Sequence, residues 1–183
     1  MDEDKKIIED FLDGDEYAFE RLLDKYFRAV YNFLYQLIKD VSVTEDITQE
    51  TFIKTWKNIK RFDREKNFKT WVFTIAKNTA YDYFKKKKTI PFSFFENEEG
   101  NNKLENISEN NILPDEILER KDIADELEKK LQEIPEKYRL ILTLRYKEDF
   151  SLSEISKILD KPYNTIKSSH QRALRSLREV MDA

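Results

Sequence analysis

The chain has 183 residues, with 33 Lys/Arg against 37 Asp/Glu and a formal net charge of −4, a length that suits one ordinary domain or two small ones. It has no cysteine, which excludes disulfides and thiolate zinc sites. It has a single histidine, His170, so catalytic triads and the usual zinc enzymes lack the residues that they need. We therefore expect no metal, no cofactor and no enzymatic activity of its own.

The N-terminal sequence "MDEDKKIIEDFLDGDE" is acidic and has no apolar centre, so it does not resemble a signal peptide. No stretch approaches the ~18 apolar residues of a membrane-spanning helix. We expect a cytoplasmic protein without direct membrane insertion.

The modest net charge hides a strong asymmetry. Residues 1–50 carry 6 Lys/Arg and 14 Asp/Glu, a net of −8, whereas residues 51–88 carry 12 Lys/Arg and 3 Asp/Glu, a net of +9. Net charge alone argues against nucleic acid as a partner, but this local cationic segment favours one.

Two glycines and four prolines, with apolar residues at helical spacing, predict an all-α protein. In the first half we expect helices over residues 2–12, 16–40, 42–59 and 67–88. Ser42 and Glu45 have the spacing of a capping box that would begin the third helix. In the fourth helix we expect Phe68, Trp71, Val72, Ile75 and Thr79 to face inward, and another side to carry Phe73, Lys77, Tyr81 and Lys85.

Residues 89–114, "TIPFSFFENEEGNNKLENISENNILP", lack any period and predict a flexible, acidic linker. A helix near 115–134 follows, and Pro135 fits the first position of the next helix. Ser151 and Glu154 predict a second capping box, with Phe150 and Ile155 as a hydrophobic staple. A short helix to about Leu159, a turn over 160–162 and a last helix to about Met181 form a helix-turn-helix pattern.

The last helix divides into two faces. From Lys161 to Arg178 it has five Lys/Arg and no acid. One side is directed inward and contains Ile166, His170, Ala173 and Leu177. The other side contains Asn164, Lys167, Ser168, Gln171, Arg172 and Arg175. This pattern favours a DNA-reading helix over an ordinary solvated face, and His170 is expected to be a packed, hydrogen-bonded residue.

The stretch "NFKTWVFTIAKNTAYDYFKKKK", residues 67–88, contains six aromatic residues and six lysines. Aromatic rings stack on unpaired bases and cations follow the backbone, so this helix suits melted DNA. The alternative is that the aromatics are core residues, which we expect in part. The polar face of the preceding helix, "TEDITQETFIKTWKNI", is either solvated or a docking surface, and physical arguments alone do not choose.

Taken together and in this order, these three segments resemble bacterial RNA polymerase sigma factors, most closely the compact extracytoplasmic-function group. "TEDITQETFIKTWKNI" is similar to the polymerase-clamp-binding motif of the family. "FKTWVFTIAKNTAYDYFKKKK" is similar to its −10-element helix, and "SLSEISKILDKPYNTIKSSHQRALRSL" to its −35-element helix-turn-helix. The resemblance implies region 2 over residues 1–88, a linker over 89–114 and region 4 over 115–183.

The resemblance also implies roles for individual residues. Core polymerase would be bound by Asp46, Gln49, Glu50, Phe52 and Trp56. The −10 element would be bound by Arg61, Phe62, Lys66, Asn67, Lys69, Trp71, Lys77, Asn78, Tyr81 and Lys85, with the loop 61–67 capturing a flipped base. The −35 element would be read by Thr165, Lys167, Ser168, Gln171, Arg172 and Arg175.

The implied partners are promoter DNA, the β′ clamp helices and β flap of core RNA polymerase, and an anti-sigma factor. The chain would direct polymerase to promoters and capture the melted −10 strand, and catalysis would belong to polymerase. Two rivals remain at this point: a two-domain regulator that binds duplex DNA without polymerase, and a helical adaptor that binds only proteins.

Overall fold

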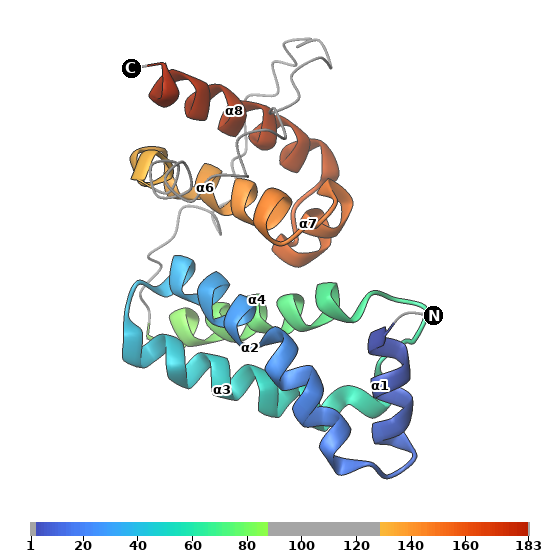
Figure 1. Cartoon of the computed structure of the whole chain (residues 1–183). Coiled ribbons are helices and arrows are strands. Elements are labelled where there is room, and N and C mark those ends of the chain that lie inside the picture. The colour runs from blue at the N-terminus through green and yellow to red at the C-terminus, as the bar shows by residue number, and fades with distance from the viewer. Residues whose placement is uncertain (1–2, 88–128, 183) are drawn as a thin grey trace.

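The computed structural model describes residues 3–87 and 129–182, and within these ranges the chain is helical with no strands, as the composition predicts. Two helical units lie one above the other in Figure 1. The first consists of α1 (Glu3–Leu12), α2 (Glu16–Ile38), α3 (Val41–Asn58), a 3-10 turn (Ile59–Arg61) and α4 (Phe68–Lys86). The second, after helical residues 129–133, consists of α6 (Glu136–Leu142), a π-helical turn (Thr143–Lys147), α7 (Leu152–Leu159) and α8 (Tyr163–Met181).

The linker expected over 89–114 lies outside the described residues, as does most of the helix expected near 115–134. Pro135 is the N-cap of α6, one position earlier than the sequence suggested.

The boundary between α2 and α3 differs from the expected one. α2 ends at Ile38, where Lys39 adopts the left-handed conformation with φ 59°. Asp40 then caps α3, because its Oδ1 accepts a hydrogen bond from the Val43 N–H at 2.9 Å. The expected N-cap at Ser42 is therefore wrong: an aspartate two residues earlier already satisfies a free N–H of the first turn.

α3 packs inside the first unit through four threonines, Thr44, Thr48, Thr51 and Thr55, all fully buried. Each hydroxyl donates to the carbonyl oxygen four residues earlier, at 2.6 to 2.8 Å. The hydroxyls are thus satisfied within the helix, and they pack inward beside the two large buried side chains of α3, Ile47 and Phe52. The acidic side chains of α3 lie on the opposite, exposed side.

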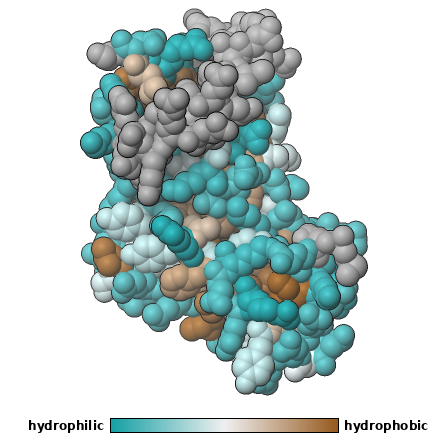
Figure 2. Space-filling view, viewed as in Figure 1, coloured by the Kyte–Doolittle hydropathy of each residue, from teal (hydrophilic) through white to brown (hydrophobic). Residues whose placement is uncertain are grey.

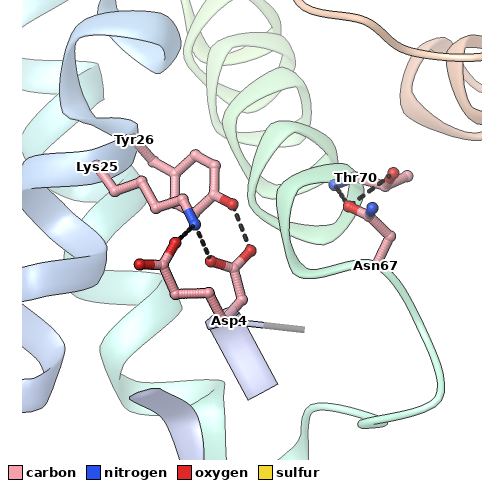
Figure 3. Close-up of polar contacts among 6 residues, drawn as sticks. Asp4, Lys25, Tyr26, Asn67 and Thr70 are labelled. Carbon is pink, nitrogen blue, oxygen red and sulfur yellow. Dashed lines mark hydrogen bonds and ion pairs between the residues drawn. The ribbon is translucent and has the colours of Figure 1, made fainter. Parts of the chain in front are cut away.

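α1 is fixed to α2 by a buried carboxylate. Asp4, 6% exposed, accepts a short hydrogen bond from the Tyr26 hydroxyl and pairs with the Lys25 ammonium at 2.7 Å (Figure 3). Burial disfavours the Lys25 ammonium, yet its hydrogen bonds with Asp4 and Glu3 raise the pKa above its ordinary value. The charge of Asp4 is therefore matched where α1 crosses α2.

The helix-turn-helix of the second unit forms as predicted. Ser151 and Glu154 make both hydrogen bonds of the capping box, and Phe150 and Ile155 are both buried in one cluster. α7 ends at Leu159, where Asp160 adopts the left-handed conformation with φ 53°, and α8 begins at Tyr163. An aspartate tolerates this conformation better than most residues, so the tight turn forms without glycine.

α4 packs against α2 and α3 of its own unit and against α7 of the second unit. The expected division of its faces is wrong in part. Phe73 and Lys77, expected on a side apart from the inward stripe, are 0% and 8% exposed, because α7 packs against that side of the helix. Trp71 and Ile75, expected in the inward stripe, are only half-buried.

Within the described residues no helix has the length and apolar character needed to cross a membrane. The face of the molecule in Figure 2 is mostly hydrophilic and has only small hydrophobic patches.

Candidate nucleic-acid interface

A groove of about 390 Å³ runs between α3 and α4. It is lined by Lys54, Asn58, Arg61, Trp71, Ile75, Asn78, Thr79 and Asp82. The five α4 residues step by four, three, one and three positions, so they occupy one face of the helix. The groove therefore combines one large ring, two amides, two cationic groups and the Asp82 carboxylate. The ring, the amides and the cations are groups that stack on and hydrogen-bond to a nucleobase.

The Trp71 ring packs against the rings of two buried phenylalanines. Its centroid lies 4.9 Å from that of Phe62 and 5.6 Å from that of Phe68, and the latter two rings meet edge to face. Phe68 in turn contacts Tyr26, the residue that binds Asp4. Such ring contacts fix the orientation of Trp71 while leaving part of the ring accessible.

Lys54 bridges the two walls of the groove. Its Nζ lies 2.9 Å from Glu50 Oε1 on α3 and donates to Thr79 Oγ1 on α4 at 3.2 Å. The ammonium thus contacts both helices that line the groove, where its positive charge favours an electronegative ligand atom. Because Lys54 is about one-third exposed, its pair with Glu50 adds little to stability.

The structure does not bring together all the residues expected to bind the −10 element. Arg61, Trp71 and Asn78 line the groove, whereas Lys69 and Lys77 face the second unit. Phe62, at 8% exposed, is a supporting core residue. Asn67 is the N-cap of α4, since its Oδ1 accepts from the Thr70 N–H at 2.9 Å (Figure 3). The remaining members are exposed: Lys66, Tyr81 and Lys85.

The residues expected to bind polymerase lie along α3. Asp46, Gln49, Glu50 and Trp56 are exposed. Phe52 is 5% exposed and stacks on Phe27 of α2, so it supports the face rather than forming it. Ile53, which the sequence analysis did not include, is 52% exposed on the same side.

The residues expected to read the −35 element lie on α8. Lys167, Arg172 and Arg175 are exposed, while Thr165, Ser168 and Gln171 are half-buried. The inward side of α8 contains Ile166, Ala173 and Leu177, all buried. α8 lies at the far side of its unit from α1–α4 in Figure 1, so this face is not covered by the first unit.

His170 is a packed residue, as expected. Its Nε2 lies 3.1 Å from the Tyr146 hydroxyl, and the two rings stack with centroids 5.8 Å apart. Burial, together with the positive charge of Arg145, lowers the pKa of His170 below its ordinary value of 6.5.

This shift predicts a pH dependence of stability. Because the folded state disfavours the proton, the unfolded chain binds more protons as the pH falls below 6.5, and the free energy of unfolding decreases. We expect stability to fall from pH 7.5 to 5.5 and the single histidine to titrate below 6.5 by NMR. His170→Gln should remove this part of the pH dependence; an unchanged dependence, or a titration above 6.5, would contradict the burial argument.

Sequence reasoning missed the contribution of α3 to the groove. Lys54 and Asn58 are one helical turn apart, and Asn58 Nδ2 donates to the Lys54 carbonyl oxygen at 2.8 Å. The only signal in the sequence for this contribution was the i,i+4 spacing of these two polar residues, which places them on one face of α3. In residues 3–87 and 129–182 no group of three or more potential metal ligands gathers.

Comparison with known protein families identifies the class of protein to which the chain belongs. Residues 22–90 match the model of Sigma-70 region 2, and residues 124–177 match that of Sigma-70 region 4. The groove, the α3 face and α4 lie in the first of these regions, and the helix-turn-helix lies in the second.

Similarity to individual proteins identifies the group within this class. The chain is 33% identical to the ECF RNA polymerase sigma factor SigW of Bacillus subtilis, over 97% of this chain and 96% of that one. It is 29% identical to the ECF RNA polymerase sigma-E factor of Escherichia coli, over 98% and 92% of the two chains. The chain belongs to the extracytoplasmic-function family of RNA polymerase sigma factors.

Two solved structures share the fold. CnrH in complex with the cytosolic domain of CnrY has a TM-score of 0.62 and 18% identity, over 98% of this chain and 97% of that one. The sigma factor RpoE in complex with the anti-sigma factor NepR, from Bartonella quintana, has a TM-score of 0.61 and 23% identity, over 91% and 98%.

Proposed function

We propose that the chain binds core RNA polymerase through the exposed face of α3 and directs it to promoters with separate −10 and −35 elements. The groove between α3 and α4 then captures an unpaired base of the −10 strand. The observation that carries this proposal is the groove itself, where a braced Trp71 ring, the Asn78 amide and Arg61 converge. Catalysis belongs to polymerase, and the chain supplies recognition and strand capture.

Base capture in this groove is chemically reasonable. A single-stranded base exposes its π-face and its hydrogen-bonding edge, and a half-buried tryptophan next to an amide can bind both. In duplex DNA the π-face is stacked and the base-pairing edge is occupied by the partner base, so neither is open to such a groove. A purely duplex-binding regulator would therefore have no use for this arrangement.

The α8 face is proposed to read the −35 element. In a helix-turn-helix the second helix enters the major groove, and its exposed side chains contact base edges and phosphates. Lys167, Arg172 and Arg175 supply the positive charge for this.

Phosphate contacts make a testable prediction. If Lys167 and Arg175 each neutralise one phosphate, alanine at either position should lower −35 affinity at all sequences and reduce the slope of log K against log salt by about 1. Fluorescence anisotropy of holoenzyme on a −35 duplex at several salt concentrations would measure it. Lys129→Ala, an exposed lysine in the same unit, is the control; equal slopes in all three variants would remove these two residues from the interface.

We also propose control by an anti-sigma factor that covers the polymerase-binding face. The support is the likeness in fold to the complex of RpoE with the anti-sigma factor NepR. Such a partner should compete with core polymerase for this chain. If a captured candidate partner binds the holoenzyme as tightly as the free chain, this form of control is wrong.

The decisive experiment for the function is reconstitution with core polymerase and a promoter library. Specific transcripts that require this chain would support the proposal. Tight operator binding by the chain alone, with no effect on polymerase output, would instead indicate a duplex-binding regulator.

A further inference from the structure

A buried carboxylate on the first turn of α1 fixes the side chain of Tyr26 on α2. Asp4 accepts a hydrogen bond from the Tyr26 hydroxyl and, at 2.7 Å, another from the Lys25 ammonium (Figure 3). Asp4 and Tyr26 are only 6% and 5% exposed, so this hydrogen bond is withdrawn from water. Hydrogen bonds to an ionised acceptor are strong, and more so in such surroundings, so the phenol has one preferred position.

A series of ring contacts leads from Tyr26 to the groove. The Tyr26 ring centroid lies 5.7 Å from that of Phe68, the first residue of α4, and Phe68 lies 5.6 Å from Trp71. Phe62 meets Phe68 edge to face and lies 4.9 Å from Trp71. The first three rings are buried, and only the Trp71 ring is half-buried. Because protein interiors are close-packed, a displacement of the Tyr26 ring has to be accommodated by Phe68 and then by Trp71.

α1 also lies beside the loop between α3 and α4. Glu9 Oε1 is 3.7 Å from the Arg64 guanidinium, and both side chains are about half exposed. Such a pair adds little to stability, but it places α1 against the loop 61–67. Asn67, the last residue of this loop, is the N-cap of α4. α1 therefore contacts the segment before α4 directly through Glu9, and the start of α4 indirectly through Tyr26.

The other end of α1 has an attachment of its own. Ile7 and Ile8 are buried in the core of the unit, and the Phe11 ring lies 5.7 Å from that of Phe19 on α2. Loss of the Asp4 carboxylate should therefore loosen the first turn of α1 without detaching the helix. This separation allows the role of the carboxylate to be tested in a folded chain.

We propose that Asp4 and Tyr26 are positioning residues for base capture, and that they act on the Trp71 ring through Phe68. A ring that already has the right orientation loses less conformational freedom when a base stacks on it. The affinity for an unpaired base is then multiplied by the fraction of molecules whose ring is correctly oriented. This role in base capture rests on the proposed function of the groove, but the effect of Asp4 on the Trp71 ring does not.

The state of the ring can be measured directly, because the chain has only two tryptophans, Trp56 and Trp71. With fluorotryptophan in the full chain, each gives one fluorine NMR signal, and Trp56→Phe assigns them. Asp4→Ala should shift and broaden the Trp71 signal, whereas the signal of Trp56, which is 53% exposed on α3, should keep its parent position. Asp13→Ala, the same change at an exposed position just after α1, should leave both signals unchanged.

Tyr26→Phe is the second variant for this measurement. It keeps a ring against Phe68 and removes only the hydroxyl, so the core is preserved even if Asp4→Ala unfolds the unit. The Trp71 signal should shift in this variant too, with the Trp56 signal in its parent position as evidence that the unit is folded. A parent-like Trp71 signal in either folded variant would overturn the positioning role.

The consequence for DNA is measured by anisotropy of holoenzyme on a fluorescein-labelled single strand that carries the −10 element of a promoter found by start mapping. Asp4→Ala should weaken binding about fivefold, the loss expected if about one ring in five is correctly oriented. Its affinity for a −35 duplex should equal that of the parent. Because the effect passes through the ring, Asp4→Ala should cause no further loss in a chain that already has Trp71→Ala.

The outcomes separate this inference from the proposed function of the groove. Parent-like strand binding by Asp4→Ala, or an equal loss with and without Trp71, would overturn the positioning role while base capture by Trp71 stands. Parent-like strand binding by Trp71→Ala alone would contradict base capture in the groove, and with it any role of Asp4 in that step.

Discussion

Alanine at both Trp71 and Asn78 is expected to abolish most promoter opening by the reconstituted holoenzyme. Stacking on one aromatic ring contributes ~1–3 kcal/mol per base, so loss of the ring alone should reduce opening about 5- to 150-fold. Loss of the Asn78 amide removes hydrogen bonds to the base edge and should add to this. The measurement is 2-aminopurine fluorescence at the −10 strand of a promoter found by start mapping.

Two controls make this result specific to stacking. Trp71→Phe keeps a ring on the Phe62 and Phe68 support and should retain much of the opening. Tyr17→Ala removes an aromatic side chain that is 75% exposed and remote from the groove, and should behave like the parent. If the double alanine variant stays folded by circular dichroism and opens the promoter normally, the groove does not capture a base.

The second large effect concerns the α3 face. Replacing Asp46, Gln49 and Trp56 with alanine should weaken binding to core polymerase at least 30-fold, because exposed aromatic and charged residues at the centre of an interface can each cost 2 kcal/mol or more. All three side chains are exposed, so the fold should be unaffected. Anisotropy of the dye-labelled chain titrated with core polymerase would measure the affinity.

Glu20→Ala, an exposed acidic residue at the start of α2, is the matched control for this face. It should bind polymerase as the parent does. Parent-like affinity in the triple variant would mean that polymerase uses another surface, even if transcription depends on the chain.

The parts of the structure that were predicted correctly depend on short-range signals. The capping box of Ser151 and Glu154, the turn at Asp160 and the bounds of α8 follow from residues within four positions of one another. Capping-box spacing also predicted an N-cap at Ser42, and that prediction was wrong. Asp40 is an equally good capping residue two positions earlier, and α3 begins after it. Neighbouring capping residues compete, and sequence spacing alone does not choose between them.

The structural features that the sequence did not predict depend on contacts between segments that are distant in the chain. Periodicity places Phe73 and Lys77 on one side of α4, but that side is buried by contacts with distant segments: Phe73 lies against Phe33 of α2 and against Phe150, and α7 packs on α4. Likewise, Lys54 belongs to the groove because α3 packs against α4. No local pattern in α4 indicates which of its polar sides faces solvent, the second unit or a ligand.

The most direct test of the function is transcript start mapping with core polymerase, the full chain and a library of random promoters. We predict transcripts that appear only when the chain is present and that share two conserved upstream sequences at a constant separation. The same pool transcribed by the Trp71 and Asn78 double alanine variant should lose these starts. Identical starts with and without the chain, or starts that share no upstream sequence, would contradict the conclusion that this protein directs polymerase to promoters.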